Sequence, residues 1–325
     1  MSSTPLPVIH GASAANYPFE LTYSFLTGIG EWQNGAQQRW IRQPGGLVKI
    51  AIPYAQMTQA QKNTVKAAFT GAAGRFEQNL EISLPFGGSL ATFFNFGMDA
   101  DEWAATESKT TQYAGPMRLT QSITQSLSPG TPGLAFPTLA NGTIGILPYV
   151  QKKRFQTVAQ KVEAGPIYTL AEFGGGLSGY PKDGLMSWEF DMQLVSDADL
   201  VTLVAHFIAN WGRAYSFLFK DEASGSVLSA AINSSVTAIP FATDPALAVG
   251  QAFEIDAEQF HVTAVWGGAT LTATRAYNGT TAAAHLIIAP LFCVYLNTHW
   301  AVDDLVVTYR GVNDSSLKIM LEATN

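Results

Sequence analysis

The sequence predicts a mainly β protein that contains two tandem copies of one domain, each with several strands and one helix, and a small all-β insertion in the second copy. Three observations lead to this prediction. Val, Ile, Thr, Phe and Tyr runs are broken by Gly, Pro and Asn, two isolated segments have helical periodicity, and both helices belong to an internal repeat. A chain of 325 residues is long enough for two or three domains.

Two helices are predicted, over Thr58 to Ala73 and over Ser196 to Trp211. Each begins with a Thr or Ser that can act as N-cap, and each is followed by a glycine that can end it. The second helix has an apolar face that should pack on a core. This face is formed by Leu200, Leu203, Val204, Phe207 and Trp211.

The internal repeat is clearest around these helices. Met57 to Arg75 aligns without a gap with Val195 to Arg213, 138 residues further on. Six of the 19 aligned positions are identical, where chance would give about one. We therefore expect a repeat signature that consists of Phe69, Gly74 and Arg75 in the first copy and Phe207, Gly212 and Arg213 in the second.

The repeat extends upstream of the helices. Leu47 to Ile50 faces Leu185 to Trp188 at the same offset, and Phe25 faces Phe155 at an offset of 130. An insertion in the glycine-rich loop Gly174 to Pro181 accounts for the difference, and such loops tolerate insertions.

The ends of the two copies are also matched, Gln112 to Gly115 with Thr308 to Gly311. The intervening Ser, Pro and Gly residues predict a linker. We expect the first copy over 1–127, the linker over 128–133, the second copy over 134–222 and 291–325, and the inserted β module over 223–290.

The inserted module has its own strand pattern. A hairpin turn is predicted at Trp266 to Ala269. Short strands are predicted over Ser235 to Phe241, Ala252 to Ile255, Phe260 to Val265 and Thr270 to Thr274.

The charge pattern argues against nucleic acid as a direct ligand. The chain has 18 basic and 25 acidic residues, and its one basic run is Lys152 to Arg154. The single cysteine, Cys293, lies in an apolar run, which indicates a buried, inert thiol and a protein that folds in a reducing compartment. We expect neither a signal peptide nor a membrane span.

The sequence offers no pattern for catalysis, so we expect no enzyme, cofactor or metal site. Asp99 to Glu102 carries three carboxylates but lacks the glycine and distal glutamate of a calcium loop, which favours a solvated turn. The histidines lack metal-ligand spacing. They are His10, His206, His261, His285 and His299.

Several of these motifs occur together in a known family. Asn34 to Trp40, Met57 to Gln61 and Gly74-Arg75, followed in the second copy by Phe207 to Arg213, resemble the minor or distal tail proteins of long-tailed phages and gene transfer agents. Arg275 to His285 is similar to part of a small β module common in phage tail and baseplate proteins.

This resemblance implies a tail-tube-like β-sandwich or barrel in each copy and a structural, nonenzymatic role. The expected assembly is a homo-oligomeric ring at the tail tip of the virion, built in the bacterial cytoplasm, that joins the tail tube protein to the baseplate hub proteins. The family usually has one such domain, and Thr169-Leu170 stands in the second copy where Arg39-Trp40 stands in the first. Weakly charged strands suit edge-to-edge joining.

Three alternatives stay open at this point. The ring is either a trimer with six similar domains or a hexamer with the two copies at different radii. The Gly-Arg pairs either end the helices or contact a neighbouring carboxylate. A carbohydrate-binding or host-adhesion module is the alternative function, with an aromatic platform of Trp266, Tyr277 and Trp300; a tail-associated hydrolase would need a carboxylate pair that the sequence does not display.

Overall fold

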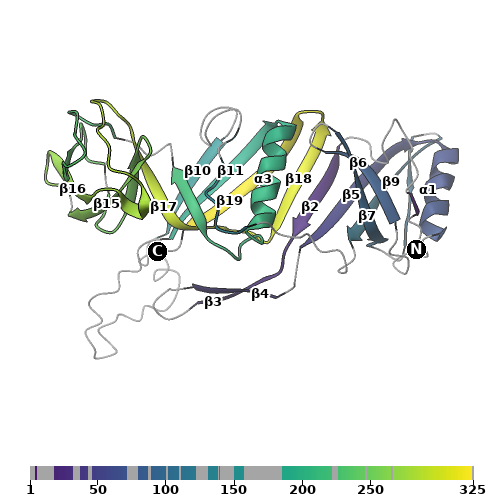
Figure 1. Ribbon diagram of the computed structural model, residues 1–325. Helices are drawn as coiled ribbons and strands as arrows, with labels where there is room; N and C mark the ends of the chain where they lie inside the picture. Colours follow the sequence, from purple (N-terminus) through teal and green to yellow (C-terminus); the bar gives the residue numbers. More distant parts are fainter. Residues whose placement is uncertain are drawn as a thin grey trace, which may run out of the picture. The chain divides into compact units, whose positions relative to one another are not determined.

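A computed structural model shows that the chain forms two compact units (Figure 1). The first unit combines Met1–Gly133, Leu147–Tyr215 and His299–Thr324, and the second combines Leu134–Ile146 with Ser216–Thr298. The predicted domain boundaries do not coincide with these units and stay a prediction. The structure describes residues 4–5, 18–31, 37–42, 46–71, 80–86, 89–99, 102–109, 111–121, 131–137, 139, 150–156, 185–221, 226–245, 247–264 and 266–323.

The fold is mainly β, as predicted. Most strands belong to one large, chiefly antiparallel sheet, and β3 (Thr27–Glu31) and β4 (Gln37–Ile41) form a separate hairpin. Within the described ranges there are two α-helices, α1 (Gln59–Gly71) and α3 (Asp197–Ala209).

The sheet of the first unit has a long run of paired strands. The order is β10 (Val150–Gln156), β11 (Leu185–Val195), β19 (Asp314–Ala323), β18 (Asp304–Gly311), β2 (Phe19–Ser24), β5 (Leu47–Met57), β9 (Gln112–Gln121) and β8 (Thr106–Lys109). β7 (Ser89–Met98) pairs with the other end of β9, β6 (Leu80–Phe86) with β7, and β1 (Thr4–Pro5) in parallel with β6.

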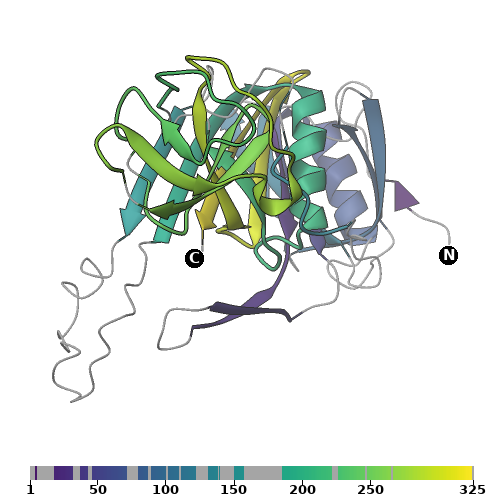
Figure 2. The ribbon, with the colours of Figure 1, turned by 60° about the vertical axis from the view of Figure 1, so that its left-hand side comes forward.

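The strands of this sheet have one apolar and one polar face, because successive side chains point to opposite sides. On β5, Val48, Ile50 and Ile52 are buried, whereas Lys49 and Pro53 are exposed. Helix α3 covers part of the apolar face, over the second-half strands (Figures 1 and 2). The core beneath α3 includes the fully buried aromatic side chains Trp188, Phe190, Phe207 and Trp300.

Both helices begin where the sequence predicts, at a polar N-cap. At Thr58, Gln61 N–H donates to the Thr58 hydroxyl (3.3 Å), and Thr58 N–H donates to Gln61 Oε1 (2.8 Å), which is a reciprocal capping box. Ser196 accepts from Asp199 N–H (3.2 Å). Each helix ends two residues before its predicted end.

The second unit contains the inserted segment and the strands that flank it. Its pairing order is β13 (Ala238–Pro240), β16 (Thr270–Thr274), β15 (Glu258–Ala264), β14 (Ala252–Ile255), β17 (Leu291–Trp300, of which 291–298 belong to this unit) and β12 (Phe217–Asp221). Two strands match their predicted bounds, one is shorter and one begins two residues earlier. The predicted turn is present, with Gly268 at φ +89°.

The core of the second unit is aromatic and aliphatic. Phe253 and Phe260 stack with their ring centroids 4.8 Å apart, and Phe241 packs edge-on against Phe253. Burial of these rings is the main stabilising contribution expected in so small a unit.

Candidate assembly interface

The sheet of the first unit contains one pattern of strand pairing twice. We call β2, β5, β9 and β8 the first-half sheet and β10, β11, β19 and β18 the second-half sheet. In each set the first strand pairs with the second, the second with the third and the third with the fourth, all antiparallel. In each set the helix follows the second strand in the chain.

The second strand and the helix agree residue by residue between the two sets. β5 and β11 have 11 residues each, α1 and α3 have 13 each, and both pairs start 138 residues apart. The pairing with the third strand is interrupted between Tyr54 and Met57 and, at equivalent positions, between Met192 and Val195. Such a bulge bends and twists a strand at a defined point.

A left-handed residue occurs in both bulges. Gln56 and Leu194, again 138 residues apart, both have φ of 54°. Residues other than glycine adopt this conformation infrequently, so its occurrence at equivalent positions is strong evidence that the two backbones follow the same path.

The closing hairpins also agree, at an offset of 202. Pairing is interrupted after Glu107 in β8 and after Tyr309 in β18, and the turn residues Thr111 and Asn313 have φ of 68° and 55°. By this register Gln112 is equivalent to Asp314. The sequence match of Gln112 to Gly115 with Thr308 to Gly311 is therefore wrong.

The first strands agree at an offset of 132, two residues from the offset in the sequence alignment. Tyr23 pairs with Val48, and Phe155 pairs with Met186, which is equivalent to Val48. Phe155 therefore corresponds to Tyr23 and not to Phe25. The alignment still had the correct face of the strand, because a shift of two residues preserves it.

The two sets join edge to edge through β2 and β18, and we call this junction the seam. Six residue pairs run from Ser24 with Asp304 to Phe19 with Tyr309. The Phe19 and Tyr309 rings are buried and stack at 4.8 Å with an interplanar angle of 7°. Past the last pair, Phe25 N–H donates to the Asp303 carbonyl (2.9 Å).

A salt-bridged arginine links the β3–β4 hairpin to the second-half sheet. This hairpin stands apart from the large sheet in Figures 1 and 2. Arg39 Nη1 donates to the Arg213 carbonyl (2.8 Å), and Arg39 Nη2 donates to Glu322 Oε1 (2.5 Å). The Arg39 side chain is 4% exposed, and this burial lowers its pKa, while the hydrogen bond and charge of Glu322 act in the opposite direction.

The hairpin requires a glycine under its tryptophan. A Cβ on Gly28 would lie 2.3 Å from the Trp40 ring, which faces it across the two strands. Arg39 and Trp40 are the residues that the resemblance singled out in the first copy, and both hold this hairpin.

The predicted signature residues have different environments. Phe207 is fully buried, with its ring 5.0 Å from that of Trp300, and Gly212 adopts the left-handed φ of +59° just after α3. Arg213 Nη2 lies 3.6 Å from Glu322 Oε1 of the same chain. Phe69 is only half-buried. Gly74 and Arg75 lie outside the described residues.

Two histidines of the first unit are buried without metal partners among the described residues. Trp300 Nε1 donates to His206 Nδ1 (3.3 Å) beneath α3. Burial lowers the pKa of His299 to about 4, and the positive charge of Arg39 acts in the same direction.

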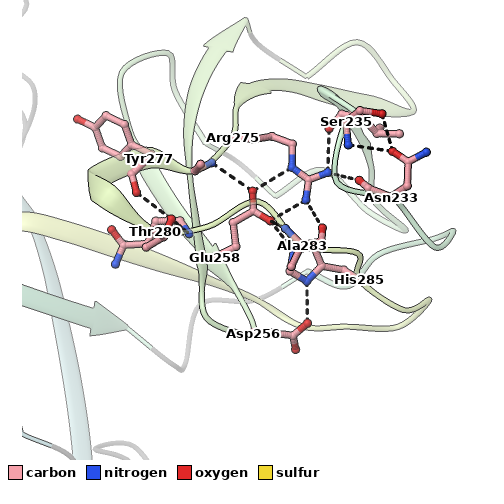
Figure 3. A network of polar contacts seen from close by, with 12 residues as sticks. Asn233, Ser235, Asp256, Glu258, Arg275, Tyr277, Thr280, Ala283 and His285 are labelled. Atoms are coloured by element: carbon pink, nitrogen blue, oxygen red, sulfur yellow. Dashed lines mark hydrogen bonds and ion pairs between the residues drawn. The ribbon is translucent and has the colours of Figure 1, made fainter.

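The second unit contains a buried network of charged groups around Glu258 (Figure 3). Glu258 is 1% exposed and accepts from Arg275 Nε (2.9 Å), Arg275 Nη2 (2.6 Å) and the Ala276 and Ala283 N–H groups (3.2 and 2.8 Å). His285 contacts Glu258 through Nε2 (2.8 Å) and Asp256 through Nδ1 (2.7 Å).

This network is closed around its carboxylate. Burial alone would raise the pKa of Glu258, but the hydrogen bonds from Arg275, Ala283, His285 and Ala276 outweigh burial and hold it at about 2. Because protein groups already occupy the acceptor positions of Glu258, the network has the character of a structural core and not of a general acid or base.

Other predicted sites are placed as follows. Trp300 is fully buried in the first unit, so the platform of Trp266, Tyr277 and Trp300 is wrong in its third member. Cys293 is half-buried on β17. Within the described ranges, no group of three or more His, Cys, Asp or Glu side chains could hold a metal ion, and no helix is long and apolar enough to span a membrane.

No protein-family model and no curated protein matches the chain. The sequence also gave no indication of the seam, because Phe19 and Tyr309 are 290 residues apart and carry no motif. Their alternating apolar pattern marks each segment as a strand but does not say with which strand it pairs.

Proposed function

We propose that this chain is a structural subunit of a phage-type tail tip, in which a duplicated tail-tube-like domain forms a ring between the tail tube and the baseplate hub. The observation that carries the proposal is the seam, where one four-stranded set adds edge to edge to a second set with the same pairing order. The motifs that resemble distal tail proteins support the same assignment.

The first step of the proposal is that the two sets are copies of one β-sandwich or barrel domain. The equal lengths of β5 and β11 and of α1 and α3 support it, as do the equivalent bulges. Gln56 and Leu194 add a shared backbone conformation that a chance similarity of two β structures would not explain.

The second step concerns the polarity of the seam. The last strand of one set, β18, pairs with the first strand of the other, β2, so the contact joins two different edges. A contact of this head-to-tail kind can be repeated by further sets and gives a ring when the rotation per set closes. The chain would then contain one such ring contact within itself.

The third step selects between the two rings. Both sets lie in one sheet, side by side, which favours a trimer with six similar sets around one channel. A hexamer with the two sets at different radii would require them in separate layers. Three chains would also reconcile a six-fold tube with a three-fold hub, which is the task of a junction protein.

The experiment has two parts. Native mass spectrometry of the purified chain should give a species of three chains, and electron microscopy should show a ring with six similar positions. Six chains at two radii would contradict the trimer. Antibodies against the chain should label the tail tip of particles produced by its own host, and labelling of the head or of the tail shaft alone would contradict the tail-tip assignment.

A further inference from the structure

We infer that β10 of one chain pairs antiparallel with the segment Glu102–Glu107 of a second copy of this chain. The biological setting of this contact rests on the proposed function, whereas its geometry rests on the seam. The partner is therefore another molecule of the same protein, and the contact is made by two edges that lie at the opposite ends of one run of strands.

The equivalences between the two sets identify these edges. β10 corresponds to β2 at the offset of 132, and the segment 102–109 corresponds to 304–311 of β18 at the offset of 202. Among the described residues, β10 pairs on one side only, with β11, and β8 pairs with β9. The chain thus contains one joined pair of equivalent edges, the seam, and a second pair on its outer sides.

The seam also gives the register of the new contact. The pair Ser24 and Asp304 translates into Gln156 with Glu102, and Tyr23 with Leu305 translates into Phe155 with Trp103. At the other end, Phe19 and Tyr309 translate into Gln151 with Glu107. Lys153 is then opposite Ala105, and Arg154 is opposite Ala104.

Charge complementarity supports this register. The one basic run of the chain, Lys152 to Arg154, occupies the middle of β10, whereas Glu102 and Glu107 are exposed on the other edge. In the translated register, Lys153 is diagonal to Glu107 and Arg154 is diagonal to Glu102, each two residues from the direct partner and on the same face. Opposite charges at such diagonal positions attract across an antiparallel pair.

The same charges select the partner edge. Two β10 strands that met each other would bring six basic side chains together, and two acidic edges would also repel, so pairing of like edges is disfavoured. Lysine on a sheet edge also opposes nonspecific strand addition. The seam is held by the apolar Phe19–Tyr309 stack, whereas the contact between chains would be electrostatic and weakened by salt.

Disulfide cross-linking tests the register directly. A chain with Lys153→Cys and Ala105→Cys should oxidise to a closed covalent ring, visible as one band of three chains on a nonreducing gel. The control carries Gln156→Cys and Ala105→Cys, which the register separates by three residues, about 10 Å along the strand. It retains Cys293, as the test variant does, and should cross-link little.

Charge reversal tests the pairing without new cysteines. Lys153→Glu and Glu107→Lys should each weaken association about tenfold or more, as measured by light scattering at low salt, and the double variant should regain most of it. Melting temperatures close to that of the unchanged chain would establish that the single variants are folded.

The outcomes separate this inference from the proposed function. A ring without in-register cross-links, or single variants that assemble normally, would overturn the strand pairing and leave the tail-tip ring intact. A chain that stays monomeric at all concentrations would also overturn the pairing. A cross-linked ring whose antibodies never label tails would support the pairing and contradict the tail-tip assignment.

Discussion

The first-half and second-half sheets have the same backbone plan but bury different amounts of apolar surface against their helices. Helix α3 buries Leu200, Leu203, Val204 and Phe207, whereas Val65 is the one fully buried side chain of α1. The shared features are strand order, bulge position and caps. The comparison teaches that these backbone features are maintained while core side chains differ, as expected when the apolar pattern, and not particular residues, specifies a fold.

The largest expected difference is at the two aligned phenylalanines. Phe207→Ala should reduce the free energy of unfolding by about 3–5 kcal/mol, because it removes a fully buried ring that contacts Trp300. Phe69→Ala should cost about 1 kcal/mol, since Phe69 is half-buried. Urea denaturation measures both. Equal costs would mean that the two helices anchor alike, against the structure.

Acid should act mainly on the second-half sheet. The pKa of His299 is lowered to about 4 in the fold, so the unfolded chain takes up this proton first as pH falls. Stability should therefore decline from about pH 6.5 to about pH 4, by about 2–3 kcal/mol from this residue. The first-half sheet, from 19 to 121, contains no histidine.

His299→Gln provides the test for this acid effect. Its unfolding free energy, measured by urea titration at pH 7, 5.5 and 4, should fall less than that of the unchanged chain. An identical pH profile for the two proteins would show that His299 is not the group that titrates.

The bond between the β3–β4 hairpin and the second-half sheet should be worth less. Arg39→Met removes the donors to the Arg213 carbonyl and Glu322 and should cost about 2 kcal/mol, because a partly buried carboxylate then keeps only the more distant Arg213. The matched control is Arg42→Met, on the same hairpin and exposed, which should cost below about 0.5 kcal/mol. Arg39→Lys should not restore stability, since lysine cannot reach both acceptors.

The smallest expected effect is also the most direct test of equivalence. Gln56→Gly and Leu194→Gly should each stabilise the chain by about 0.5–1 kcal/mol, because glycine adopts the left-handed conformation without steric cost. Thermal denaturation should give shifts of the same sign for both. Opposite signs would mean that the two bulges are not equivalent.

The local features of the fold could be predicted from the sequence, and the pairings between distant segments could not. Thr58 and Ser196 marked the helix starts, and glycine marked the turn at Gly268, since caps and turns depend on neighbouring residues. The closing hairpins escaped because Thr111 and Asn313 adopt one turn conformation with different side chains. The contact of Arg39 with Glu322 joins residues 283 positions apart, which no local pattern encodes.

The seam has a consequence for how an assembly of this kind can grow. Because β2 and β18 belong to one polypeptide, their effective concentration is set by the chain itself and the seam forms without a bimolecular encounter. Each added molecule then contributes two sets at once, so a closed ring can contain only an even number of them. Rings of five or seven sets, the nearest errors to six, are excluded by covalent connectivity before any interface has to discriminate against them.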